Sequence, residues 1–137
     1  AAPLPLLFPS RTGTKSEELH SMQDELRLFR KNHGDTVDMV IADDSMMPAL
    51  MPGDHVSGVR YYTQDLSETA AAKLRGWICI VQTSSGETLV RILEKGTQPG
   101  YYQIRPFASS PDNAYPEVEI FSIAPILWTR RKNPLVE

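Results

Sequence analysis

Apolar and polar residues alternate in several short runs between positions 36 and 130, which is the period of half-buried β-strands. In TVDMVIA the apolar positions are Val37, Met39 and Ile41, every second residue of the run. The same pattern predicts further strands at HVSGVRYY, WICIVQT, ETLVRIL, YYQIRP and EVEIFSIAPILWTRR. The chain is therefore predicted to be mainly β, with a bent antiparallel fold.

Turn residues refine this prediction. The tripeptide SSG between WICIVQT and ETLVRIL indicates a tight hairpin. Gly58, inside HVSGVRYY, indicates a β-bulge. Pro125 has no N–H to donate to a neighbouring strand, so it predicts a bend or an edge position in the last strand.

Helical periodicity occurs at residues 16–31, before the first strand. The apolar positions recur there at steps of three and four and form one stripe: Leu19, Met22, Leu26 and Phe29. SETAAAKLRG predicts a short helix that ends at Gly76. Three prolines in residues 1–13 exclude a helix and indicate an extended arm or linker. We therefore expect an arm at 1–13 and one domain at 14–137, with its β part at 36–132.

Composition narrows the possible functions. The chain has 137 residues, enough for one domain, and its net charge of −3 argues against a phosphate-binding surface of its own. The single cysteine, Cys79, lies in an apolar run, so we expect a buried, inert thiol in a reducing compartment. The three histidines, at positions 20, 33 and 55, lack the spacing of metal ligands. No metal, cofactor or membrane span is predicted.

One stretch, DDSMMPALMPGDHV at residues 43–56, suggests chemistry. Ser45 follows a predicted strand and precedes a turn, which places its hydroxyl where backbone N–H groups could face an oxyanion. Gly53 permits a tight turn, and Asp54 can accept the backbone N–H bonds that hold that turn. Taken alone, a serine in a turn is more often a local cap than a nucleophile.

The whole stretch resembles the nucleophile segment of the LexA, UmuD and phage-repressor peptidase family. That pattern runs Gly-x-Ser-Met-x-Pro-x-Leu and then Gly-Asp-x-Val, and the matching residues here are Ser45, Met46, Pro48, Leu50, Gly53, Asp54 and Val56. Asp43 stands where the family usually has glycine. The likeness extends from about residue 36 to residue 132, and it implies a LexA-like peptidase fold.

The resemblance assigns Ser45 as the nucleophile, but it places Arg91 where the family has its general-base lysine, in the run VRIL. An arginine stays protonated in proteins and has no lone pair for a serine proton. We expect Arg91 to donate a hydrogen bond to Ser45, and Asp44 to bind Arg91 if the turn brings them together. Lys95 lies about 13 Å further along the strand, and neither Lys73 nor His55 is expected to replace the base.

The resemblance therefore implies a C-terminal regulatory and dimerisation domain of a bacterial or phage transcriptional regulator that lacks self-cleavage. The dipeptides Ala-Gly and Cys-Gly, at which the family mostly cleaves itself, do not occur in the chain. The family further implies a cytoplasmic homodimer, DNA binding through a helix-turn-helix upstream of this chain, and a RecA-like co-regulator.

Two enzymatic alternatives remain from the sequence. An active, UmuD-like serine peptidase of the Ser-Lys type would slowly process the arm, and Ser45→Ala would abolish that cleavage. A type I signal peptidase uses a similar Ser-Met and Gly-Asp pattern, but it needs a membrane anchor, and the sequence contains no apolar run of the required ~20 residues.

Overall fold

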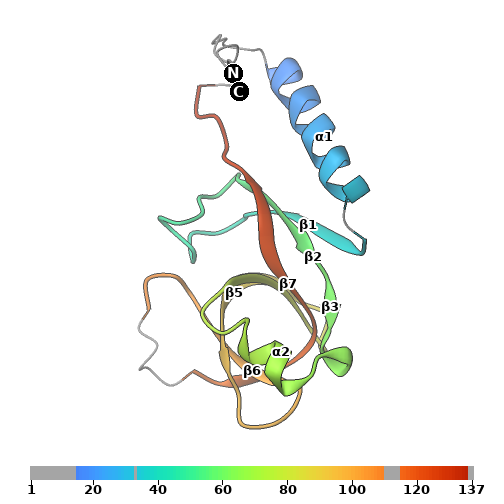
Figure 1. The fold of residues 1–137 in the computed structure, drawn as a ribbon. Coiled ribbons are helices and arrows are strands. Elements are labelled where there is room, and N and C mark those ends of the chain that lie inside the picture. The colour runs from blue at the N-terminus through green and yellow to red at the C-terminus, as the bar shows by residue number, and fades with distance from the viewer. Residues whose placement is uncertain (1–14, 33, 110–114, 136–137) are drawn as a thin grey trace, which may run out of the picture.

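The computed structural model describes residues 15–32, 34–109 and 115–135, so the predicted arm at 1–13 lies outside the described part. The described residues form two α-helices, a short 3₁₀ turn and seven strands, and the prediction of a mainly β fold is confirmed (Figure 1). The helices are α1 (Lys15–Asn32) and α2 (Glu68–Ala72), and the 3₁₀ turn is η2 (Thr63–Asp65). The strands are β1 (Thr36–Val40), β2 (His55–Val59), β3 (Tyr61–Tyr62), β4 (Ile78–Thr83), β5 (Thr88–Lys95), β6 (Tyr101–Arg105) and β7 (Glu117–Arg130).

The strands form one antiparallel sheet that closes on itself. Its order is β1-β2-β7-β4-β5-β6, and β3 also pairs with β7. Strand β6 pairs with β5 on one side and with β7 on the other. Strands β4, β5, β6 and β7 therefore enclose a small barrel, the ring in the lower half of Figure 1. The predicted hairpin joins β4 to β5 through Gly86, whose φ of 101° is readily adopted by glycine.

Strand β7 belongs both to the barrel and to the outer part of the sheet. Its residues 120–125 pair with β4, whereas residues 126–130 pair with β2. Pro125 is buried and lies at the change of partner. Strands β4 and β3 flank β7 just before it, and just after it the β4 side of β7 is unpaired among the described strands.

Glycine is required where β2 crosses this change of partner. The β2–β7 register shifts between Ser57 and Gly58, so the irregularity predicted at Gly58 is present, with Leu127 of β7 as the extra residue. A Cβ atom at Gly58 would lie 2.2 Å from the carbonyl oxygen of Pro125, closer than any side chain tolerates. The bulge lets β2 approach β7 at the point where β7 leaves the barrel.

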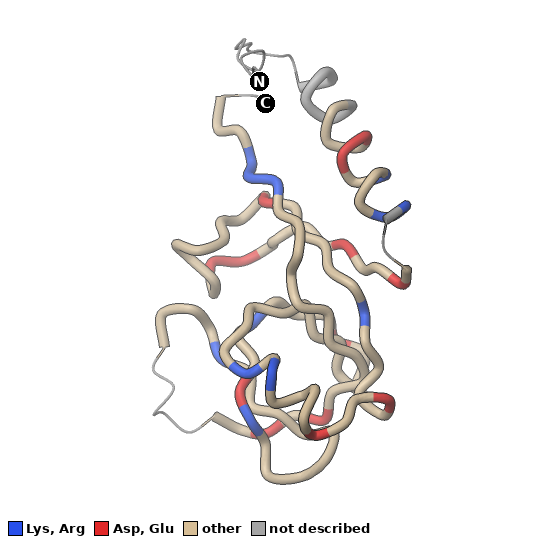
Figure 2. The backbone as a smooth tube through the Cα atoms, in the orientation of Figure 1, with Lys and Arg blue, Asp and Glu red and all other residues tan. Residues whose placement is uncertain are grey.

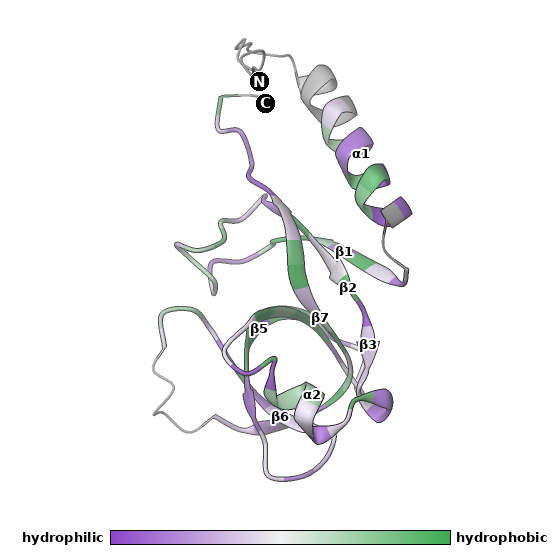
Figure 3. Ribbon diagram, in the orientation of Figure 1, coloured by the Kyte–Doolittle hydropathy of each residue, from purple (hydrophilic) through white to green (hydrophobic). Residues whose placement is uncertain are grey.

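Alternate residues of the barrel strands fill two separate cores. The ribbon of β5 and parts of β7 are coloured as hydrophobic in Figure 3. The barrel interior contains Cys79, Val81, Leu93, Ile120 and Ile123, and Leu66 and Leu74, on either side of α2, pack against it. The outer core lies between the barrel and the segment from β1 to β2, and it contains Ile41, Met46, Leu50, Val56, Ile80, Val90, Ile92 and Ala124. Burial raises the pKa of the Cys79 thiol to about 12, so the thiol is inert as predicted.

The predicted helices are present with altered ends. Helix α1 covers the predicted range, and Met22 is buried on the predicted stripe while Leu28 on the opposite face is exposed. Helix α2 is shorter than predicted: the Ser67 side chain caps its start by accepting the Ala70 N–H at 3.1 Å, and it ends at Ala72, before Gly76. Neither helix is long and apolar enough to cross a bilayer.

Candidate functional site

The segment that carries Ser45 is a loop between β1 and β2, closed at its base by backbone hydrogen bonds. The Ile41 N–H donates to the Asp54 carbonyl, and the Gly53 N–H donates to the Ile41 carbonyl, both at 2.8 Å. Gly53 has a φ of 97°, and a Cβ atom there would lie 2.6 Å from Cδ of Lys132. The tight turn predicted at Gly53 is therefore present. Glycine suits this position because its φ is positive and because the Lys132 side chain lies where a Cβ atom would be.

Asp54 holds this turn with a buried carboxylate. Its Oδ2 accepts the Met51 N–H at 2.9 Å, as the sequence predicted for a turn aspartate. Two further donors come from beyond β7, the Lys132 N–H on Oδ1 at 2.8 Å and Arg131 Nε on Oδ2 at 2.7 Å. The sequence pattern did not indicate these long-range donors, which satisfy a charge that would be costly to bury alone.

The apolar residues of the motif anchor the loop. Met46 and Leu50 are buried in the outer core, and the Leu50 N–H donates to the Met46 carbonyl at 2.9 Å. Pro48 is exposed and follows a cis peptide bond. Anchoring by Met46 leaves its neighbour Ser45 half-buried, at the surface of the loop.

The Ser45 hydroxyl is bound by the residue two positions before it. Ser45 Oγ donates to Asp43 Oδ1 at 2.7 Å, and the Ser45 N–H donates to the same oxygen at 3.1 Å. On its other side, the Ser45 carbonyl accepts the N–H of Phe107, from the loop after β6, at 2.9 Å. Ser45 is therefore held through its hydroxyl, its amide and its carbonyl.

The structure brings Arg91 to the same site, but through Asp43. Arg91 Nη2 lies 3.8 Å from Asp43 Oδ2, and Nη1 donates to the Val90 carbonyl at 2.8 Å. The expected hydrogen bond from Arg91 to Ser45 is absent from the described contacts, since the Asp43 carboxylate lies between them. The sequence led us to expect Asp44 as the partner of Arg91, but that partner is Asp43. The Asp44 carbonyl accepts the Met47 N–H at 3.1 Å.

The electrostatics of the site keep the proton on Ser45. The hydrogen bond from the Ser45 hydroxyl lowers the pKa of Asp43, the Ser45 amide lowers it further, and the Arg91 charge adds a smaller contribution. A carboxylate with a lowered pKa is a weak base. The guanidinium of Arg91 offers no lone pair at all.

The other basic side chains considered from the sequence make no hydrogen bond to Ser45 in the described part of the chain. His55 begins β2, opposite Val40 and Arg130. Lys95 ends β5 opposite Tyr102, and Lys73 is exposed after α2. His33 lies outside the described residues, among which no group of three or more potential metal ligands occurs.

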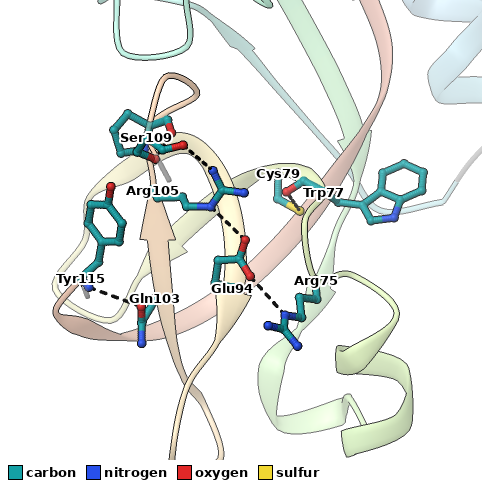
Figure 4. A network of polar contacts seen from close by, with 9 residues as sticks. Arg75, Trp77, Cys79, Glu94, Gln103, Arg105, Ser109 and Tyr115 are labelled. Carbon is teal, nitrogen blue, oxygen red and sulfur yellow. Dashed lines mark hydrogen bonds and ion pairs between the residues drawn. The ribbon is translucent and has the colours of Figure 1, made fainter. Parts of the chain in front are cut away.

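An ion-pair network, partly buried at Glu94 and Arg105, supports the loop that contacts Ser45 (Figure 4). Glu94 of β5 accepts from Arg105 Nε at 2.9 Å and from Arg75 Nε at 3.2 Å. Arg105 Nη1 also donates to the Ser109 carbonyl at 3.3 Å, and so restrains the loop that includes Phe107. Sequence reasoning missed this network, although opposite charges inside two successive strands were a usable signal.

No protein-family model and no curated protein matches the chain. The chemistry open to the site is set by three side chains, those of Ser45, Asp43 and Arg91. A hydroxyl, a carboxylate and a guanidinium lie in that order across it, and each one satisfies the next. Such an arrangement orients the serine hydroxyl toward the Asp43 carboxylate.

Proposed function

We propose that this chain is the regulatory and dimerisation domain of a LexA-like or phage-repressor-like transcriptional regulator, in which Ser45 is not a working nucleophile. The observation that carries the proposal is the 2.7 Å hydrogen bond from Ser45 Oγ to Asp43, together with the pairing of Asp43 to Arg91. Ser45 lies on the loop between β1 and β2 and Arg91 lies on β5, the second strand of the hairpin, and both positions support the proposal. The nearest base to the serine hydroxyl is thus a carboxylate of lowered pKa, and among the described residues no lysine takes that place.

The two departures from the family pattern form one compensated change. Asp43 stands where the family has glycine and Arg91 where it has lysine, and these two residues form an ion pair beside Ser45. A lysine can act as a base when burial lowers its pKa, whereas arginine keeps its proton. Without a general base, a serine nucleophile loses orders of magnitude in rate.

The test is the reactivity of Ser45 toward a fluorophosphonate, which reports an activated serine without needing a known substrate. We expect no labelling of the natural chain. In Arg91→Lys alone, the new lysine still faces the Asp43 carboxylate, which favours its charged form. The double variant Asp43→Gly with Arg91→Lys restores both family residues, so we expect labelling there that increases at alkaline pH.

Adding Ser45→Ala to the double variant serves as the control and should remove all labelling. Labelling of the natural chain that Ser45→Ala abolishes would overturn the proposal. It would favour the second candidate, an active serine peptidase. That candidate has one supporting observation, the carboxylate within hydrogen-bonding distance of the hydroxyl, and it also predicts that the purified chain shortens itself.

A free strand edge supports the dimerisation part of the proposal. Beyond Pro125, β7 continues for five residues that pair with β2, while no described strand pairs with them on the β4 side. A groove of about 430 Å³ adjoins this edge, lined by Leu50, Arg75, Gly76, Trp77, Ile78, Ile126 and Thr129. An unpaired edge with apolar surroundings is suited to pairing with β7 of a second copy.

Substitution of Trp77 tests this interface, because its side chain lines the groove and is 49% exposed. Trp77→Glu should convert a dimer to a monomer in analytical ultracentrifugation. Phe121→Glu is the matched control, since Phe121 is equally exposed (49%) but lies on the part of β7 flanked by β3 and β4. A monomeric natural chain, or equal effects of both substitutions, would contradict dimerisation through this edge.

DNA binding through an upstream helix-turn-helix and control by a RecA-like partner belong to the same proposal. The net charge of −3 on this chain provides little attraction for phosphates. Residues 1–137 alone should therefore fail to retard DNA in a gel at low salt. Retardation by this chain alone would refute the assignment of DNA contacts to an upstream domain.

A further inference from the structure

The basic run TRRK at residues 129–132 is more than a charged end of the last strand (Figure 2). Arg130 is the final residue of β7 and Arg131 follows it. Arg130 Nη1 forms an ion pair with Glu25 of α1, whereas Arg131 Nε pairs with Asp54 of the Ser45 loop. Two consecutive arginines therefore bind two elements that lie far apart in the sequence.

On the loop side, the contact reaches the base of the Ser45 loop. Four backbone amides depend on this region: Ile41 on the Asp54 carbonyl, Gly53 on the Ile41 carbonyl, and both Met51 and Lys132 on the Asp54 carboxylate. Because Asp54 is buried, losing Arg131 or the Lys132 amide would leave charge on its carboxylate poorly satisfied. The geometry of the loop thus depends on where the end of β7 lies.

On the helix side, ion pairs join α1 to the strands. Besides Glu25 with Arg130, Arg30 of α1 pairs with Asp38 of β1. Asp38 in turn accepts the hydroxyl of the buried Ser57 at 2.7 Å. In Figure 1, α1 stands beside the open end of the strands, away from the barrel. Its position is therefore sensitive to charge and salt.

We propose that Arg130 and Arg131 form a two-sided clasp that transmits the position of α1 to the loop carrying Ser45. When α1 is docked, Glu25 fixes Arg130, and the adjacent Arg131 and Lys132 amide stay on Asp54. When α1 moves away, the end of β7 gains freedom and the four amides at the base of the loop lose protection. This inference rests on the proposed function only in naming the Ser45 loop as the regulated element.

Amide hydrogen exchange, measured by NMR on the full chain, tests the clasp. Glu25→Arg places like charges against Arg130, and we expect exchange at Ile41, Met51, Gly53 and Lys132 to accelerate about fivefold, the size expected for an exposed ion pair. The Thr83 amide, bonded to the Glu87 carbonyl in the β4–β5 hairpin, should not change. The charge-swapped double variant, Glu25→Arg with Arg130→Glu, should restore slow exchange.

Arg27→Glu is the matched variant, because it also reverses a charge on α1 but pairs with Asp24 on the same helix. It should leave the four loop amides unchanged. If Glu25→Arg alters exchange along α1 but not at the four loop amides, or if Arg27→Glu accelerates them equally, the clasp is refuted. Exchange at Ile41, Met51 and Gly53 is measured without reference to Ser45 labelling, so the clasp can fail without the assignment of Ser45 as an inactive nucleophile, and the reverse.

Discussion

Strand β5 contributes to two carboxylate–guanidinium pairs that differ in environment. Arg91 faces Asp43 at 3.8 Å, and the Asp43 side chain is 57% exposed. Three residues further on, Glu94 binds Arg105 at 2.9 Å, and these side chains are only 12% and 11% exposed. The first pair lies beside the Ser45 hydroxyl, whereas the second ties β5 to β6 and to the loop after it.

The same chemistry therefore serves two purposes, according to how far each pair is buried. A pair in water contributes little to stability, because solvent screens the attraction and ordering both side chains costs entropy. Its value at Asp43 is local, since it fixes which group the serine hydroxyl faces. A desolvated pair is different: removing one partner leaves the other charge without compensation inside the protein.

Glu94→Gln should have the largest effect on the stability of the fold. It leaves Arg105 and Arg75 without their shared carboxylate, and we expect the free energy of unfolding to fall by about 3 kcal/mol. Urea denaturation measures this loss, and faster modification of the buried Cys79 thiol would report the same opening. Glu87→Gln, on the exposed turn of the hairpin, is the control and should change stability by less than about 0.5 kcal/mol.

Arg91→Gln should have a smaller effect. The pair that it breaks is largely in water on the Asp43 side, so we expect a loss below about 1 kcal/mol by the same denaturation measurement. A loss as large as that of Glu94→Gln would show that burial does not separate the two pairs, and would remove the basis of the comparison.

The pH dependence of the exposed pair gives the smallest effect. The folded-state pKa of Asp43 is lowered from its ordinary value of 3.8, mainly by the hydrogen bond from the Ser45 hydroxyl. A lowered folded pKa means that Asp43 stabilises the fold above pH 3.8, and that this contribution is lost as the pH falls through the folded pKa. The stability difference between the natural chain and Asp43→Asn should therefore shrink below pH 4, as followed by acid titration of denaturant midpoints. A difference that grows on acidification would reverse the assigned sign.

Much of the local structure could be predicted from sequence. The strands and the hairpin follow from period-two alternation and turn residues, and the bulge at Gly58 follows from a glycine inside a strand. Arg91 was expected beside Ser45, and it lies beside Asp43, the residue that accepts the Ser45 hydroxyl. In these cases the deciding interactions lie within a few residues of one another.

Longer-range features escaped the sequence reasoning. Two features depend on the register between strands that are distant in the sequence, which local alternation does not encode. They are the pairing of β6 with β7 and the change of partner of β7 at Pro125. Asp44, rather than Asp43, was expected beside Arg91. Adjacent side chains on extended backbone point in opposite directions, and the conformation of the loop decides which of the two faces Arg91. A signal was present: the two positions that depart from the family pattern, Asp43 and Arg91, carry opposite charges.

The shared role of β7 has a consequence for unfolding. If β7 detaches, its partners in the barrel and its partner β2 in the outer part of the sheet all lose hydrogen bonds. The barrel and the outer strands are therefore expected to unfold together. We expect heat or denaturant to produce one cooperative transition, with tryptophan fluorescence and far-UV circular dichroism changing together. A molecule of two cores should thus behave, thermodynamically, as a single unit.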